Sequence, residues 1–202
     1  MIMSDAGIKK AIADGELVIS PVPDEDQYTT SAVDLFLGDK STFKGWDEDR
    51  FNVPGARVDL DLSLQSFPAT AKGYLKKLAC ERDGSLVLPP GYDSPRPILA
   101  MTRERIHLKP GARLAARVEG RSSLARLGLV VHLTAPTIHA NWNGPITLEM
   151  INHGPFCLRL VPGKTRICQL IVERLESLPE GDINTVFQGQ ISPGGETRKK
   201  RR

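Results

Sequence analysis

Short apolar runs separated by tight polar turns occupy most of the chain, and this pattern predicts a mainly β protein. From residue 84 onward the runs recur about every ten residues and are separated by Pro-Gly, Asn-Gly or His-Gly turns. This spacing is typical of an antiparallel sandwich, jelly roll or barrel. The strands predicted here are 86–88, 98–102, 114–118, 129–133, 146–151, 157–160 and 167–173.

The N-terminal half carries two helical patterns. Residues 4–16 place Ile8, Ala11 and Ile12 at helical spacing behind a Ser or Asp cap, which predicts a short helix. Residues 68–82 predict a second, inserted helix with four inward side chains, namely Ala71, Tyr74, Leu75 and Leu78. A short apolar run predicts a strand at 17–19, and alternating apolar and polar residues predict further strands at 31–38 and 58–62.

The composition indicates one globular domain, which we place at residues 1–190. The chain has 202 residues, 40% of them hydrophobic and 25% charged, so it can bury a full core without disulfides. No apolar run approaches the roughly 18 residues that a membrane span needs. Residues 1–10 contain no apolar signal-peptide core. We therefore expect a cytoplasmic protein with no membrane partner.

The net charge of +3 comes from the C-terminus. Five of the 27 basic residues are the last five of the chain, and without them the balance against 24 acidic residues is −2. We expect residues 191–202 to form a disordered basic tail. Because the body of the protein is not basic and aromatic residues make up only 5% of the chain, we do not expect it to bind nucleic acid.

The three cysteines, Cys80, Cys157 and Cys168, form no C-x-x-C pair, and we expect reduced, buried thiols. Zinc-dependent nucleobase deaminases carry H-x-E followed by P-C-x-x-C. No histidine of this chain has a glutamate two residues later, so both halves of that signature are missing. We predict no zinc and no metal-ligating residues.

Two features carry candidate chemistry. Residues 119–128, EGRSSLARLG, place two arginines and two serines around a glycine, which suits either an anion cradle or a polar surface turn. Glu149 lies in an apolar strand, with Thr147 and Ile151 on its own face. It is either an edge-strand glutamate in water, a partner of an arginine, or a general acid/base.

These segments resemble the dCTP deaminases of the dCTP deaminase/dUTPase superfamily. The strongest similarity is EGRSSLARLGLVVHLTA at 119–135 followed by WNGPITLE at 142–149. SAVDLFLG at 31–38, LPPG at 88–91 and PGKTRICQL at 162–170 also match. The resemblance covers about 1–40 and 84–190 and is weak over 41–83.

The resemblance implies a distorted dUTPase-like jelly roll or β-barrel, assembled as a homotrimer with sites between subunits. It also implies hydrolysis of dCTP to dUTP and ammonia without zinc, in which Glu149 transfers the protons. Arg126 and Ser122 match residues that orient this glutamate and the water, and the carbonyl of Ala135 matches a further water contact. One carboxyl that takes a proton and returns it is worth about 10²–10⁴ in rate.

The resemblance also suggests which residues bind the substrate. Arg121, Ser122 and Ser123 match triphosphate binders, and Gln169 matches a phosphate-contacting glutamine. Thr147 and Leu148 lie on the strand that reads the base edge. Trp142 matches an aromatic residue beneath the deoxyribose, although ordinary core packing explains it equally well. Magnesium is implied through the triphosphate, and dUTP and dTTP are further candidate ligands.

The sequence departs from the family pattern at three points. His139 replaces an aspartate that binds the sugar and activates water in dUTPases, which argues against diphosphatase activity. In the lid motif at about 182–195, Phe187 and Gln190 keep the ring and the amide, but Val186 replaces a lysine. A tyrosine that precedes this motif in relatives has no clear counterpart near Pro179. A nucleotide-binding protein with little turnover is therefore the main alternative, and a dUTP diphosphatase is the weaker one.

Overall fold

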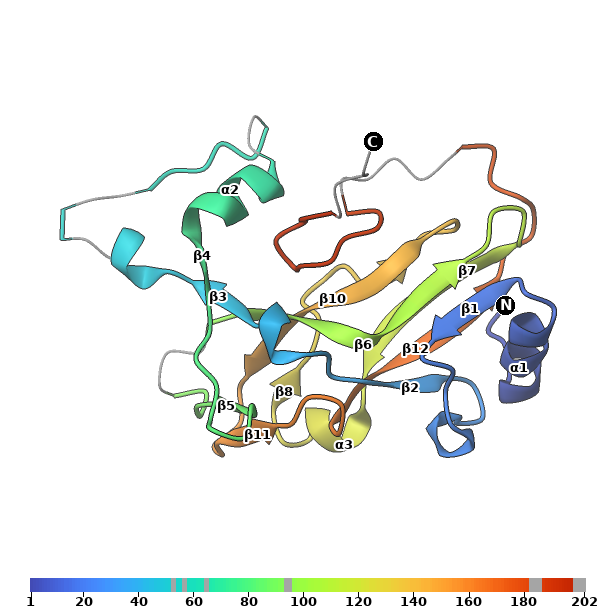
Figure 1. Cartoon of the computed structure of the whole chain (residues 1–202), viewed down its shortest axis with the longest axis horizontal. Helices are drawn as coiled ribbons and strands as arrows, with labels where there is room; N and C mark the ends of the chain where they lie inside the picture. Colours follow the sequence, from blue (N-terminus) through green and yellow to red (C-terminus); the bar gives the residue numbers. More distant parts are fainter. Residues whose placement is uncertain (52–53, 56–57, 64–65, 93–95, 182–186, 198–202) are drawn as a thin grey trace.

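The computed structural model describes residues 1–51, 54–55, 58–63, 66–92, 96–181 and 187–197. Strands dominate this part of the chain and form three antiparallel sheets, with a few short helices at their edges (Figure 1). The predicted mainly β fold is confirmed.

The largest sheet has six strands and is organised around β6. Its order is β4-β3-β6-β10-β8, and β1 also pairs with β6. The strands are β1 (Leu17–Ser20), β3 (Lys44–Trp46), β4 (Leu75–Lys77), β6 (Ile98–Leu108), β8 (Leu129–Val130) and β10 (Asn143–Asn152). β10 follows β6 along most of its length, and the register shifts between Pro145 and Thr147.

The second sheet has the order β2-β12-β7-β9, and β5 pairs with β11 in a separate ribbon. These strands are β2 (Val33–Phe36), β5 (Leu86–Leu88), β7 (Leu114–Gly120), β9 (Thr137–Ile138), β11 (Leu158–Leu160) and β12 (Arg166–Arg174). In the pairing of β2 with β12, Asp34 lies directly opposite Gln169.

The α-helices are short and lie outside the sheets. They are α1 (Asp5–Ala13), α2 (Phe67–Tyr74) and α3 (Ser122–Ala125). Ser4 caps α1 because its side chain accepts a hydrogen bond from the Gly7 amide, and Ile8 and Ala11 are fully buried against the sheets. Among the described residues, 3-10 turns lie at Glu25–Gln27, Lys40–Thr42 and Glu48–Arg50.

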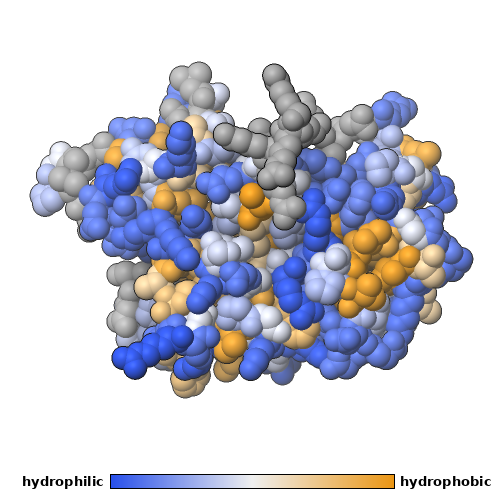
Figure 2. Space-filling view, viewed as in Figure 1, coloured by the Kyte–Doolittle hydropathy of each residue, from blue (hydrophilic) through white to orange (hydrophobic). Residues whose placement is uncertain are grey.

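The face shown in Figure 2 is mostly hydrophilic, with apolar side chains gathered in separate patches. No helix in the described part is both long and apolar enough to cross a membrane.

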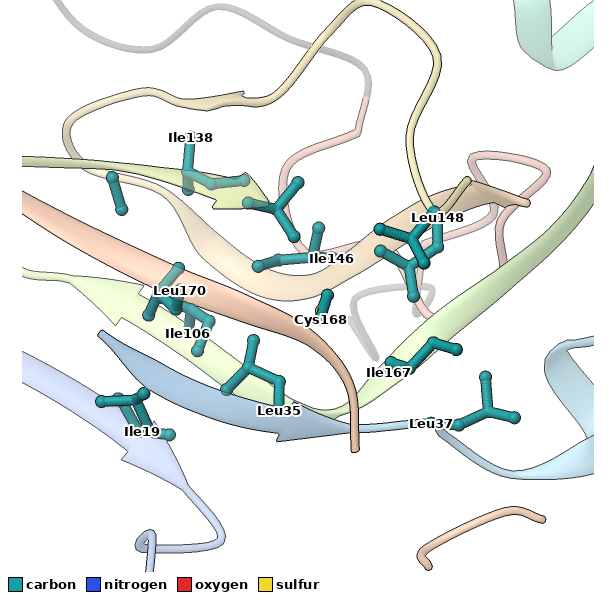
Figure 3. Packing of buried hydrophobic residues seen from close by; sticks show 14 of the residues in the cluster. Ile19, Leu35, Leu37, Ile106, Ile138, Ile146, Leu148, Ile167, Cys168 and Leu170 are labelled. Carbon is teal, nitrogen blue, oxygen red and sulfur yellow. The ribbon is translucent and has the colours of Figure 1, made fainter. Parts of the chain in front are cut away.

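The hydrophobic core lies between the two larger sheets (Figure 3). Leu148 of β10, Leu35 of β2 and Leu170 of β12 are all completely buried. Because side chains alternate along a strand, this packing turns Thr147 and Glu149 away from the core.

One predicted strand is wrong, and one predicted helix is confirmed only in part. Residues 58–62 form no strand in the described part, and Val58, Leu60 and Leu62 are exposed, since no neighbouring strand pairs with them. The predicted helix at 68–82 ends at Tyr74, because residues 75–77 pair with β3 as β4. Its expected inward residues are correct only in part, since Ala71 alone is buried.

Several strand limits also differ from the pattern. β6 is six residues longer than predicted and β8 is shorter, whereas β3 and β9 were not predicted. The three cysteines are free, but only Cys168 is buried and Cys157 is exposed. Residues 191–197 belong to the expected tail, yet they form a closed turn in which the Ile191 amide donates to the Glu196 carbonyl at 2.8 Å. Residues 198–202 lie outside the described part.

Candidate active site

A pocket of about 480 Å³ lies over β3, β6 and β10, on the face from which Glu149 projects. Its lining brings together residues from the three strands, from α2, from the loop before β10 and from the C-terminal segment. The lining residues are Trp46, Phe67, Pro97, Leu99, Leu133, Ala135, Thr137, Ile138, His139, Trp142, Ile146, Thr147, Glu149, Phe187, Gln190 and Pro193.

Glu149 reaches this pocket because of its position on β10. It pairs in register with Leu99 of β6, while its neighbours Leu148 and Met150 are buried in the core. The predicted alternation is therefore confirmed. Leu148 was predicted to contact substrate, but its side chain is fully buried, so only its backbone is available to a ligand.

Burial raises the pKa of Glu149 above its ordinary value. Hydrogen bonds from the backbone amides of Leu133 and of Glu149 itself, and the nearby His132, act in the opposite direction, because they favour the ionised carboxylate. Burial has the larger effect. A carboxyl with a raised pKa can hold and release a proton closer to neutral pH than a solvated glutamate.

The pocket has an aromatic wall. Trp142 is 9% exposed, and its Nε1 donates to the Gly144 carbonyl at 3.0 Å, so it both packs in the core and lines the pocket. Both interpretations of this tryptophan are thus compatible with the structure. Trp46, Phe67 and Phe187 complete the wall.

The loop before β10 supplies two further predicted site residues, Ala135 and His139, which are both exposed at the pocket. Asn141 has a φ of 66°, the left-handed region that asparagine tolerates better than most residues. This conformation turns the chain so that His139 and Trp142 line the same pocket.

The C-terminal segment covers part of the pocket. We call residues 187–197 the C-terminal turn. Gln190 is 3% exposed, and its Nε2 donates to Thr147 Oγ1 at 2.9 Å, while its Oε1 is buried without a hydrogen-bond partner in the described part. Phe187 and Gln190 both line the pocket, whereas Val186 lies outside the described residues.

The arginine-serine cluster lies on α3 and at its two ends, apart from the pocket. Ser122, Ser123 and Arg126 are exposed, and none of them, nor Arg121, lines the pocket that holds Glu149. Within one chain, the predicted neighbours Arg126 and Ser122 are therefore not brought to the glutamate.

Asp34 contacts both Arg121 and Gln169 beneath the arginine-serine cluster. Its carboxylate is 4% exposed and lies 3.2 Å from Arg121 Nη2, while Gln169 Nε2 donates to Asp34 Oδ1 at 3.0 Å. Arg166 Nη1 lies 3.8 Å from the same carboxylate. Two predicted phosphate ligands, Arg121 and Gln169, thus share one buried anchor that sequence reasoning did not identify.

Sequence reasoning also missed Trp46 and Phe67, which lie in the segment where the family resemblance was weak. Trp46 could have been suspected, because it is one of only two tryptophans and lies in a polar stretch. Phe67 gave no such signal. In the described ranges, no group of three or more His, Cys, Asp or Glu side chains is placed to hold a metal ion.

Comparisons with known proteins bear on this arrangement. The family model described as dCTP deaminase-like matches residues 2–175. The dUMP-forming dCTP deaminase of Methanosphaera stadtmanae is 35% identical over 95% of this chain and 91% of its own. The dUMP-forming dCTP deaminase of Coprothermobacter proteolyticus is 40% identical over 96% and 95%, respectively. The dCTP deaminase of Rhodospirillum rubrum is 39% identical over 88% and 84%.

A solved structure supports the fold. The 2′-deoxycytidine 5′-triphosphate deaminase of Agrobacterium tumefaciens superposes with a TM-score of 0.57 at 20% identity over 85% of this chain. The match covers 47% of that protein, so this chain spans about half of its length. With a family model that covers most of the chain and relatives matched along nearly their whole length, the chain belongs to the dCTP deaminase-like family.

Proposed function

We propose that this protein deaminates dCTP hydrolytically to dUTP and ammonia. The observation that carries the proposal is the position of Glu149, a carboxyl whose pKa is raised by burial in a pocket large enough for a ligand. Family membership and the names of the full-length relatives support the same reaction.

In the proposed reaction Glu149 is the proton shuttle. The ionised carboxylate takes a proton from a water molecule while the oxygen of that water adds to C4 of cytosine. The carboxyl later gives this proton to the substrate. The two protons of the water end on N3 and on the departing nitrogen, so the products are dUTP and NH₃. We propose that the carbonyl of Ala135, which lines the same pocket, helps to hold this water.

The pocket also offers groups for the nucleotide. Gln190 Oε1 lacks a hydrogen-bond partner in the described part, and leaving such an acceptor buried costs about 1–3 kcal/mol. An N–H or O–H of the ligand would satisfy it. Thr147, His139 and Trp142 line the same space and are our candidates for base and sugar contacts.

The arginine-serine cluster completes the site from a second chain in this proposal. Arg121, Ser122, Ser123 and Arg126 are available on the surface but do not line the pocket of their own chain. A homotrimer that places one protomer's α3 at its partner's pocket would bring triphosphate ligands and the orienting guanidinium to Glu149. We propose that magnesium arrives with the triphosphate and that no zinc takes part, since the zinc deaminase signature is missing from the sequence.

The second candidate is a dCTP deaminase that continues to dUMP, because two of the relatives described above bear that name. It requires a group that activates water for attack on the phosphate chain. His139 stands where the dUTPase aspartate is expected, and for this reason we favour dUTP as the product.

A product assay separates these possibilities. The purified protein is incubated with magnesium and dCTP, dCMP, cytidine or dUTP, and ammonia, pyrophosphate and nucleotide products are measured. We expect ammonia and dUTP from dCTP, and Glu149→Gln should abolish ammonia release, a loss of at least about 10² in rate, while nucleotide still binds. Equimolar pyrophosphate and dUMP would establish the second candidate. Binding without ammonia from any substrate would overturn both in favour of a nucleotide-binding protein.

A further inference from the structure

The helix α2 and the C-terminal turn meet at the mouth of the pocket. Phe67, the first residue of α2, and Phe187 have ring centroids 5.8 Å apart at an interplanar angle of 54°. Both rings line the pocket. Figure 1 shows the C-terminal turn, in red, between α2 and β10.

The turn approaches α2 closely at Gly195. Gly195 has a φ of +82°, and a Cβ built on it would lie 3.1 Å from Pro68 Cγ and 3.3 Å from Phe187 Cε1. Its neighbour Gly194 is different, because a Cβ there would make ordinary contacts, at 3.7 Å with Ser192 Oγ and 3.8 Å with Ala71 Cβ. The turn therefore packs on α2 mainly through Gly195 and Phe187.

On its other side the turn is fastened to β10. The Gly189 amide donates to the Asn143 carbonyl at 3.0 Å, and Gln190 Nε2 donates to Thr147 Oγ1 at 2.9 Å. Thr147 is two residues from Glu149 on the same face of β10. A shift of the turn would therefore move Thr147, which lines the pocket next to Glu149.

We propose that α2 is the docking surface of the C-terminal turn and that Phe67 is a positioning residue, which holds Phe187 over the pocket of the same chain. The inference assigns a role to a helix in the segment where resemblance to the family is weak. Its kinetic consequences rest on the proposed deamination of dCTP, whereas the docking itself does not.

Docking is tested by limited proteolysis with chymotrypsin, which cleaves after aromatic residues. Cleavage after Phe187 needs this segment to leave the fold, and the released 188–202 fragment is identified by its mass. We expect Phe67→Ala to speed release about threefold to tenfold, because the aromatic pair is lost. Phe51→Ala is the matched control: its ring lies in the same segment but faces the Arg96 guanidinium at 5.8 Å. Equal release rates for Phe67→Ala and the wild type would overturn the proposal.

A second pair of variants leaves the side chains of α2 untouched. Gly195→Ala should speed release of the fragment more than Gly189→Ala, because both glycines have a positive φ that strains alanine, but only a Cβ on Gly195 meets Pro68 and Phe187. If both alanines behave alike, the turn does not depend on the contact with α2. This pair keeps the test valid should Phe67→Ala fail to fold.

The positioning role is tested by a double-mutant cycle on turnover of dCTP. Phe67→Ala and Phe187→Ala should each raise KM about fivefold with a smaller change in kcat, and the double variant should be little worse than Phe187→Ala alone. Effects that multiply would contradict a role of Phe67 through Phe187. If the wild type releases no ammonia, the proposed function fails, and the proteolysis still decides whether α2 holds the turn.

Discussion

At the residue scale, Glu149 combines its proposed role as a proton shuttle with an environment that disfavours its charge. Its strand neighbours Leu148 and Met150 are fully buried, and the register with Leu99 fixes its own position. The carboxyl is therefore held in a surrounding that disfavours its charge. Such a site costs stability and yields a proton carrier whose pKa lies nearer to neutral pH.

The raised pKa of Glu149 predicts the pH dependence of the reaction. The shuttle must be ionised to take a proton from water, and an acid with a raised pKa stays protonated to higher pH. We expect kcat/KM for dCTP to fall as pH decreases through a value above the usual glutamate pKa of about 4.3. A pH–rate profile at constant ionic strength measures this limb. An acidic limb at or below the usual value would show that burial does not control this carboxyl.

A residue's position could be predicted from the sequence when the residues near it in the chain determine that position. The orientation of Glu149 followed from strand alternation, and Phe187 and Gln190, which the resemblance suggested as substrate contacts, line the same pocket. The anchoring of Arg121 by Asp34 could not be foreseen, because 87 positions separate them and they meet only because β12 pairs with β2 on one side and with β7 on the other.

At the element scale, the loop at the end of α3 and the turn after β10 touch each other through glycines. A Cβ on Gly154, in the turn after β10, would lie 1.9 Å from the Leu127 carbonyl oxygen, and one on Gly128 would lie 2.2 Å from the Gly154 amide nitrogen. Gly128 also has a φ of +93°. This backbone contact fixes α3, with its arginines and serines, relative to the end of β10.

We therefore expect Gly154→Ala to destabilise the protein by about 2–3 kcal/mol, because the backbone of one loop must move. Gly73→Ala is the control, since a Cβ on this helical glycine meets nothing within 4 Å and alanine favours the helix. Thermal unfolding should show a lower Tm for Gly154→Ala and an unchanged or higher one for Gly73→Ala. A Gly154→Ala protein with wild-type Tm would show that the loops do not pack as described.

Helices and strands could be predicted where the hydrophobic pattern of the sequence was matched by a neighbouring element that covers the apolar side chains. Strands with buried alternate residues, such as β7 and β12, lie close to their predicted positions. Residues 58–62 alternate equally well but pair with no strand among the described residues, and residues 75–77 pair with β3 although they continue a helical pattern. The hydrophobic pattern of a segment does not show whether another strand lies beside it. Both errors lie in the segment between β3 and β5.

At the scale of the whole molecule, the candidate site is divided between two surfaces. One holds Glu149 and the aromatic wall, and the other holds α3 with Arg121 and Arg126. A single chain does not join them. The proposed homotrimer is the arrangement that would complete the site from two protomers.

This division predicts complementation between two inactive variants. Glu149→Gln and Arg126→Ala should each lack activity as pure proteins, whereas a co-expressed 1:1 mixture should recover about a quarter of the wild-type rate by random assortment around a ring. Ammonia release from dCTP measures the recovery, and co-expression of Glu149→Gln with wild type calibrates it. A mixture as inactive as its components would place both residues in one chain's site.

Both tryptophans of the chain, Trp46 and Trp142, border the pocket. The indole emission of the native protein therefore comes entirely from the two sides of the candidate site, without contribution from elsewhere. Occupancy of the pocket can be followed by the quenching or spectral shift of that emission, in unlabelled protein and for molecules that are bound but never converted.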